Sequence, residues 1–344
     1  MLDDNETAEL IDIGNPSAEG WAECVMDNGW GDGMPAVVPT EEAIAPFVAI
    51  AKGINEPFPP LPPRLIIPTI KSLAANAVMA GCKAEHFPIV IAAMRAMSEH
   101  KYNLHGSLAT THPCGNMIMV SGPEAHRLGI NGGTNCFGQG TRANAVIGRA
   151  IQLIMRNLGG AVPGTTDRST QGTPGKYSFC FAENEEASPW PPYRIRHGFS
   201  AKDTVVTVMP GEAPHNINDH ASTTGDDILL TAANTMAQAG SNNLLGQGPC
   251  FVVWGPEHAE TLHRDKWTAE AVQNELYERS KVHESRITQA NREFFAGFGQ
   301  EPVKGYYYLT PSPQSIHIVV AGGPGKHSAF IPSFGLTDVV SMRV

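Results

Sequence analysis

The sequence contains no run of basic residues, and acidic side chains outnumber basic ones by 34 to 24, for a formal net charge of −10. A nucleic-acid backbone is bound by clustered lysine and arginine, so this composition argues against a nucleic-acid partner. No apolar run approaches the roughly 20 residues that a membrane-spanning helix requires. The first ten residues, MLDDNETAEL, lack the basic and apolar regions of a secretory signal. We therefore expect a cytoplasmic protein without a membrane partner.

Cysteine is sparse but present, with six residues among 344. In a large chain without a visible secretory signal, such residues are expected to be reduced thiols, metal ligands or nucleophiles rather than disulfides. Glycine and proline are abundant, at 35 and 27 residues. They predict many short connections and functional loops in an otherwise globular protein.

The chain divides by texture into a polar tail (1–17), a mainly helical region (18–104) and an α/β core (105–344). In the helical region we expect helices at AEGWAECVMDNG, after the N-capping Thr40, at TIKSLAANAVMAGC and at FPIVIAAMRAMSEH. The proline-rich NEPFPPLPPR cannot be helical, because proline removes backbone donors and fixes φ. In the core, further helices are expected at RANAVIGRAIQLIMRNLGG, DDILLTAANTMAQAG and TAEAVQNELYERSKV.

Three stretches of the core resemble one another: MIMVSGPEAH, FVVWGPEHAE and IHIVVAGGPGKH. Each is an apolar run followed by Gly-Pro, and the first and third place a histidine (His126 and His327) three residues after the proline. Proline suits the first turn of a helix, and the glycine before it lets the backbone leave the strand. The sequence therefore predicts an α/β fold, with repeated strand–Gly-Pro–helix modules around a mostly buried sheet and helices at the N-terminal side.

A glycine-rich segment, GINGGTNCFGQGTRANAVIGRA, runs directly into a predicted helix. Free backbone N–H groups and the positive end of the helix dipole suit an anion there. Gly138 and Gly140 would cradle the anion, while Arg142 and Asn144 would hold it with a guanidinium and an amide. The spacing also satisfies G-x-G-x-x-A, but no strand precedes it, so a dinucleotide site is not favoured. We expect a small anionic substrate.

Three cysteines lie in glycine- or proline-containing loops: Cys114 in PCG, Cys136 in NCFGQG and Cys250 in GQGPCF. If these loops converge, the thiolates could bind a metal ion or an iron–sulfur cluster. Alternatively, Cys114 alone is a reactive thiol, activated by His105 or by His112 as a base. The third alternative is that all three are packing residues, as Cys24, Cys82 and Cys180 are expected to be.

Acidic residues follow the predicted strand YSFCFA, and Glu183 and Glu186 are placed there for general acid–base catalysis. Lys176, in the turn before this strand, could pair with one carboxylate or with an anionic substrate. A solvated acidic loop is the alternative. The segment PHNINDH offers His215, Asp219 and His220 at a spacing compatible with metal ligation, which is also common in loops.

Several long blocks resemble an uncharacterised bacterial family associated with the UGSC selenoprotein domain, which is named for its Sec-Gly-Ser-Cys motif. The blocks are GWGDGMPAVVPTEE, NAVMAGCKAEHFPIVIAAM, NLHGSLATTHP, RANAVIGRA and GKYSFCFAENEEASPW. The resemblance covers the chain from about residue 20 onward. It implies thiol or selenol redox chemistry on small polar metabolites. The chain has no Sec-Gly-Ser-Cys or Cys-Gly-Ser-Cys segment of its own. The resemblance therefore implies either a partner subunit of a thiol- or selenol-bearing protein or a branch of the family that has its own active site.

Three functional hypotheses follow. In the first, an enzyme acts on a small anionic metabolite through a cysteine-lined metal–thiolate or iron–sulfur site, by a lyase, hydrolytic or reductive reaction. In the second, Cys114 acts alone as a nucleophilic or redox thiol. In the third, the chain is a non-catalytic substrate-binding subunit of a thiol or selenol redox complex. A homo-oligomer is compatible with all three.

Overall fold

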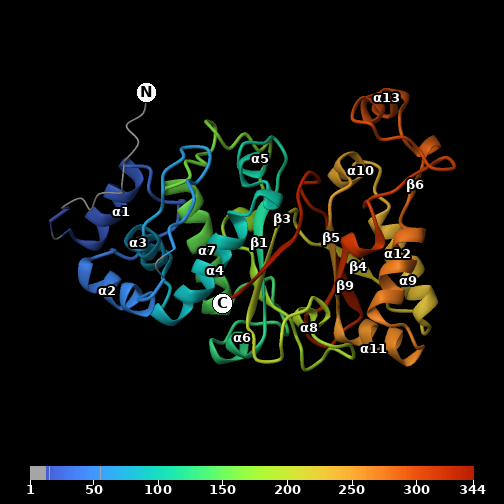
Figure 1. Ribbon diagram of the computed structural model, residues 1–344, viewed down its shortest axis with the longest axis horizontal. Coiled ribbons are helices and arrows are strands. Elements are labelled where there is room, and N and C mark those ends of the chain that lie inside the picture. The colour runs from blue at the N-terminus through green and yellow to red at the C-terminus, as the bar shows by residue number, and fades with distance from the viewer. Residues whose placement is uncertain (1–12, 15, 55) are drawn as a thin grey trace.

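Two four-stranded sheets face each other across the centre of the molecule, and helices cover the outer face of each (Figure 1). The computed structural model describes residues 13–14, 16–54 and 56–344. Most of the predicted polar tail (1–12 and 15) therefore lies outside the described residues. The α/β class expected from the sequence is confirmed, with two sheets in place of one.

Both sheets are mixed. The first has the order β10-β3-β1-β2 and consists of β1 (Gly115–Ser121), β2 (Cys180–Ala182), β3 (Val205–Gly211) and β10 (Val340–Arg343). The second has the order β4-β9-β5-β8 and consists of β4 (His215–Asn218), β5 (Cys250–Trp254), β8 (Ile316–Val320) and β9 (His327–Ile331). A two-stranded sheet pairs β6 (Val282–His283) with β7 (Tyr306–Tyr307).

The two sheets are built alike. In each, a central strand (β1 or β5) pairs in parallel with one strand (β2 or β8) and antiparallel with the next (β3 or β9). The fourth strand comes from the other half of the chain, because β4 follows β3 but joins the second sheet and β10 follows β9 but joins the first. The halves thus exchange their last strands. A bridge between Gly211 and Ser333 links the sheets where these strands cross over.

The Gly-Pro pairs begin helices in two of the three predicted modules. Pro123 begins α6 (Pro123–Arg127) and Pro256 begins α11 (Pro256–Arg264), each directly after a central strand. The third pair, Gly323-Pro324, begins no helix, because the chain turns back within a few residues to enter β9. The predicted third module is therefore a strand–loop–strand connection.

Helices form the two outer layers. The first sheet is covered by α1 (Ala18–Asp27), α2 (Glu41–Ile50), α3 (Ile70–Ala80), α4 (Phe87–Met97) and α7 (Arg142–Asn157). The second is covered by α9 (Gly225–Met236), α11 and α12 (Ala269–Arg279). The remaining helices are α5 (Leu104–Leu108), α8 (Tyr193–Arg196), α10 (Asn242–Gly246) and α13 (Gln289–Gly297). The pattern repeats between the halves, since α4 packs on β3 and β10 as α9 packs on β9 and β4.

Strand alternation explains the layers, because successive side chains point to opposite faces of a sheet. In β1, Ile118 and Val120 pack against the helices, in one core with α3 and α4. Met117 and Met119 point the other way and meet Phe251 of the second sheet in a separate apolar cluster. Both faces of each sheet are thus buried, which accounts for the continuous apolar runs in the sequence.

Helix ends follow local signals. Thr40 caps α2. Thr69 and Ser72 cap the start of α3, since the side chain of each accepts the backbone N–H of the other, and Gly81 ends α3 in the left-handed conformation.

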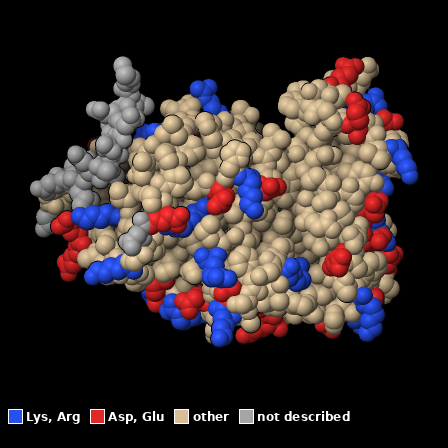
Figure 2. Space-filling model, viewed as in Figure 1, with Lys and Arg blue, Asp and Glu red and all other residues tan. Residues whose placement is uncertain are grey.

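In the part of the chain that the structure describes, no single helix is long and apolar enough to cross a membrane. Together, α3 and α4 have the length and apolar composition of such a span, but the pair is bent by 120°. Basic and acidic side chains are interspersed on the face shown in Figure 2.

Candidate active site: the Cys114 cavity

A cavity of about 530 Å³ lies where β1 begins, between α7 and the loop of residues 161–177. We call it the Cys114 cavity. Its walls include polar side chains from several segments, namely Asn116, Gln152, Asp167, Ser169, Thr173 and Lys176. The volume lies within the usual range for small-molecule sites. Gly115 allows the short 3₁₀ helix η3 (Pro174–Lys176) to approach, because a Cβ there would lie 2.9 Å from the carbonyl group of Gly175.

Cys114 lies in the wall of this cavity, and its side chain is 3% exposed. Its sulfur donates to the carbonyl oxygen of Ser107 in α5 at 3.6 Å. Burial is the main reason that the pKa of this thiol is raised to about 12. Lys176 lowers this pKa, and Asp167 and Glu212 raise it by less than Lys176 lowers it. The thiol is therefore protonated at neutral pH.

Lys176 and Asp167 form an ion pair in the same cavity, with Nζ 2.6 Å from Oδ2. Burial opposes ionisation of Asp167, but the hydrogen bond from Lys176 and the backbone N–H of Ser169 outweigh it, so the pKa of Asp167 is lowered. Asp167 is therefore a carboxylate at neutral pH. An ammonium group paired with a single carboxylate in a partly buried wall can exchange that partner for an anionic ligand.

A chain of hydrogen bonds forms one side of the cavity. Tyr102 donates to the Asn116 side-chain oxygen at 2.7 Å, Asn116 donates to Gln152 at 3.3 Å, and Gln152 donates to the Gly175 carbonyl at 3.3 Å. Each link fixes the orientation of the next amide. The Thr173 hydroxyl is buried in the cavity wall and has no hydrogen-bond partner among the described residues. It is available to a ligand.

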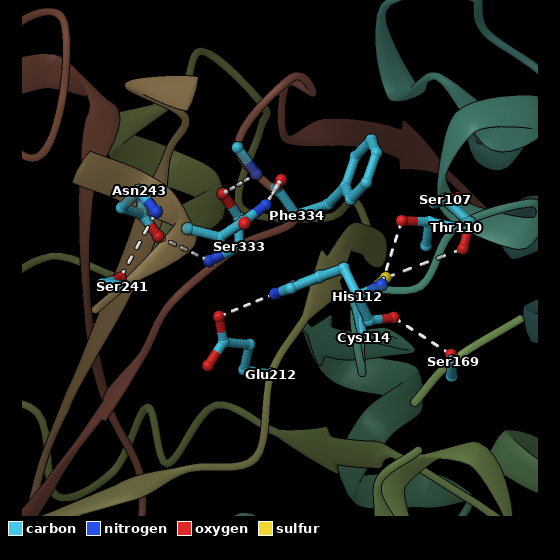
Figure 3. Close-up of polar contacts among 12 residues, drawn as sticks. Ser107, Thr110, His112, Cys114, Ser169, Glu212, Ser241, Asn243, Ser333 and Phe334 are labelled. Atoms are coloured by element: carbon cyan, nitrogen blue, oxygen red, sulfur yellow. Dashed lines mark hydrogen bonds and ion pairs between the residues drawn. The ribbon is translucent and has the colours of Figure 1, made fainter. Parts of the chain in front are cut away.

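His112 is not placed to activate Cys114. Its Nε2 lies 2.8 Å from the Glu212 carboxylate, and Figure 3 shows the ring directed toward Glu212 and away from the sulfur. Its Nδ1 is buried without a hydrogen-bond partner in the described part of the chain. The backbone of His112 supports the site instead, because its carbonyl accepts from the Cys114 N–H and from Ser169. His105, the other candidate base, is exposed on α5 beside a different pocket.

The three cysteines of the predicted metal site lie in different layers. Cys114 points to α5, Cys136 lies between the sheets and lines another cavity, and Cys250 is fully buried with Val252 on the helix-facing side of β5. Burial raises the pKa of all three thiols. Among the described residues, no group of three histidine, cysteine or acidic side chains could hold a metal ion. The geometry gives no support to a metal or iron–sulfur cluster shared by these thiols.

The glycine-rich loop also differs from the expectation. Arg142 donates from Nε and Nη2 to the Gly81 carbonyl, at 3.2 and 2.8 Å, and so satisfies the end of α3. Asn144 binds both the N–H and the carbonyl of Asn131 and the carbonyl of Cys136. Since these side chains are used within the fold, the predicted anion clamp is not formed.

The glycines of this loop serve packing and backbone conformation. A Cβ at Gly132 would lie 2.5 Å from the Ala182 carbonyl oxygen, so the loop lies directly on β2. A Cβ at Gly138 would overlap the Asn135 side chain, and Gly140 has a φ of 109°. These glycines are not evidence for a phosphate-binding loop.

The predicted catalytic carboxylates, Glu183 and Glu186, also lie apart from the Cys114 cavity. Glu183 is buried at the end of β2, and its two oxygens accept from the Tyr193 N–H at 2.8 and 3.0 Å. Burial raises the pKa of Glu183 to about 7, although the hydrogen bond from Tyr193 lowers it. Glu186 is exposed. Of the residues predicted to be catalytic, Cys114 and Lys176 line this cavity.

Sequence reasoning missed Asp167, Asn116 and Gln152. Asn116 carried a signal, because it is a polar residue at the start of an otherwise apolar strand. Asp167 and Gln152 carried none, since one lies in a polar loop and the other on a helix.

Comparison with protein-family models, with curated proteins and with solved structures gave no match. The resemblance to UGSC-associated proteins therefore stays a prediction. The function must be argued from the cavity itself.

Proposed function

We propose that the chain is a cytoplasmic enzyme that binds a small anionic metabolite in the Cys114 cavity. The observation that carries this proposal is the presence of a thiol and an ammonium group in the wall of one cavity of ligand size. Lys176 would bind the anionic group in exchange for Asp167. The side-chain amides of Asn116 and Gln152 and the Thr173 hydroxyl would bind the remaining polar atoms of the ligand.

In this proposal Cys114 acts as a proton donor. Nucleophilic attack and metal ligation both need a thiolate, which is disfavoured where burial raises the pKa to about 12. A protonated thiol can instead transfer its proton to an atom of the ligand that is more basic than a thiolate, such as the alkoxide or carbanion that forms as a bond breaks in a lyase reaction. The nearby ammonium of Lys176 stabilises the thiolate that results, and solvent returns the proton.

The test combines binding and turnover. Wild-type protein is titrated with inorganic phosphate and with short mono- and dicarboxylates, and is incubated with a polar metabolite extract that is followed by mass spectrometry. We expect Cys114→Ala to bind the ligand but lose turnover, and Lys176→Met to lose most of the binding. Lys71→Met, which removes an exposed ion pair with Glu41 on the surface, is the matched control. Full turnover by Cys114→Ala would exclude the proposed chemistry.

A second candidate function is a substrate-binding subunit that presents its ligand to a thiol- or selenol-bearing partner. It is favoured by α13, which projects from the body of the molecule (Figure 1). Phe294 of this helix is 53% exposed, and Phe298, just beyond its end, is 60% exposed. Their rings contact each other edge to face, with centroids 5.1 Å apart. Ligand binding without turnover by the isolated chain would support this candidate, and turnover by the pure chain would exclude it as a complete account.

A further inference from the structure

Two histidines on neighbouring segments direct their ring nitrogens toward one point. His327 is the first residue of β9, and His220 lies two residues beyond β4, the antiparallel neighbour of β9. Their Nε2 atoms are 3.1 Å apart, and the ring centroids are 4.8 Å apart with an interplanar angle of 76°. Both residues are exposed, so a small ion can reach them.

A contact with Asn216 sets the tautomer of His327. Its Nδ1 lies 2.9 Å from the side-chain oxygen of Asn216, which can only accept. Nδ1 therefore carries the proton, and Nε2 presents its lone pair toward His220. A hydrogen bond from the second ring nitrogen to a fixed oxygen is the usual support of a metal-binding histidine.

The distances fit a shared ion. With about 2.1 Å between a metal ion and each imidazole nitrogen, two cis ligands are about 3.0 Å apart at a right angle and about 3.4 Å apart at a tetrahedral angle. The observed separation of 3.1 Å falls between these values. Such an ion would lie about 3.2 Å from each ring centroid, which places the centroids about 4.8 Å apart. The observed centroid distance is 4.8 Å.

We infer that His220 and His327 form a binding site for a divalent transition-metal ion of the kind that imidazole prefers, such as Zn²⁺, Ni²⁺ or Cu²⁺. Two protein ligands leave the other coordination positions to water or to a bound molecule. A cavity of about 330 Å³, lined by His327, Asn216 and Cys136, lies beside the pair and has room for such a molecule. This site is separate from the Cys114 cavity and does not depend on the proposed function.

The surroundings limit the affinity. Lys326 donates to the His220 carbonyl at 3.0 Å, and its positive charge opposes a cation. The ring nitrogens of His258 and the carboxylate oxygens of Asp219 each already have a hydrogen-bond partner within the fold. With two protein ligands, we therefore expect weaker binding than at a four-ligand structural zinc site.

The experiment is calorimetric titration of tag-free, chelator-treated protein with Zn²⁺ at pH 7.5. We expect one site in the wild type. We expect His220→Gln and His327→Gln each to weaken binding at least tenfold, while Asn216→Leu weakens it about tenfold to a hundredfold through loss of the supporting hydrogen bond. His215→Gln is the matched control, because His215 is an exposed histidine of β4 that is not one of the two proposed ligands. This variant should bind Zn²⁺ as the wild type does.

Two further measurements separate the site from its alternatives. Unchanged thermal unfolding of the variants without metal would show that loss of binding is not loss of fold. Affinity should fall as the pH is lowered, because protons compete with the metal ion for the same nitrogens. Wild-type affinity in both single variants would overturn the inference. So would the lack of a bound equivalent in the wild type at millimolar Zn²⁺, which would leave the two rings sharing only a proton.

Discussion

Lys176 and Asp167 are joined by a 2.6 Å ion pair in the wall of the Cys114 cavity, and they act on the pKa of the Cys114 thiol in opposite directions. The ammonium favours the thiolate and the carboxylate opposes it. Burial raises this pKa by more than either charged group changes it, so the thiol is protonated at neutral pH. A change at either partner should therefore be measurable at the sulfur without any knowledge of the substrate.

We predict that Asp167→Asn lowers the pKa of the Cys114 thiol and that Lys176→Met raises it. Alkylation by iodoacetamide follows the thiolate fraction, so a shift of one pKa unit changes the rate at a given pH about tenfold. Peptide mass spectrometry would follow Cys114 between pH 7 and pH 10. We expect faster labelling in Asp167→Asn and slower labelling in Lys176→Met.

Cys24 serves as the internal control for this measurement, because it lies on α1 and is partly exposed. Its labelling rate should be the same in all three proteins. Equal rates at Cys114 in wild type and both variants would show that the ion pair has no electrostatic effect on the thiol.

We predict that Cys114→Ala costs about 1 kcal/mol of unfolding free energy, because it removes one small buried group. The bond from its sulfur to Ser107 is a weak one at 3.6 Å. Urea unfolding measures the cost. Cys250→Ala is the comparison, since it removes a fully buried thiol from an apolar core outside the cavity, and it should affect stability but not turnover. Equal loss of turnover in both variants would remove the case for a special role of Cys114.

Local signals predicted most of the helices and strands. Thr40 caps α2 as expected, and the Gly-Pro pairs at 122 and 255 begin helices as expected. These signals can be recognised in the sequence because they act only on adjacent residues. The exchange of β4 and β10 between the sheets could not be predicted. Both strands are short, and β4 (HNIN) is largely polar, so their partners are set by long-range pairing that leaves no local pattern.

The candidate site was predicted only in part, because some of its residues are brought together by long-range packing that leaves no local pattern. The Pro-Cys-Gly setting marked Cys114, and Lys176 was marked by its turn. Asp167 and Gln152 come to the cavity only through tertiary packing. Arg142 was predicted to bind an anion, but its guanidinium donates to the Gly81 carbonyl at the end of α3, a contact that leaves no pattern in the local sequence.

Gly148 allows α7 to pack closely against the segment that leads into β2. A Cβ at this position would lie 2.3 Å from the Ser178 hydroxyl and 2.7 Å from the Phe179 backbone nitrogen. We predict that Gly148→Ala destabilises the protein by about 1–3 kcal/mol through overpacking, despite the better helix propensity of alanine.

Gly297→Ala is the matched control for this prediction. Gly297 ends the exposed helix α13, and no described heavy atom outside its own helix and neighbours lies within 4 Å of the added Cβ. The control should be neutral or slightly stabilising. Similar unfolding midpoints for both variants would contradict the close contact between α7 and the segment that leads into β2.

Glu183 should make stability depend on pH. Burial raises its folded pKa to about 7, from the ordinary value of 4.5. Between these values the folded state keeps the proton that the unfolded state has released, so stability falls as pH rises. A difference of roughly 2.5 pKa units corresponds to about 3 kcal/mol, present in full below pH 4.5 and lost as pH rises through 7.

We therefore predict that Glu183→Gln gains stability relative to the wild type as pH rises from 4.5 to 7, and that the difference is constant above that range. Glutamine keeps an oxygen that can accept the Tyr193 N–H, so the native geometry is retained. The measurement is urea unfolding at several pH values. Glu186→Gln, on the exposed side of the same segment, is the control and should run parallel to the wild type. If Glu183→Gln also runs parallel to the wild type from pH 4.5 to 8, Glu183 is ionised throughout that range, and its burial at the end of β2 does not hold a proton.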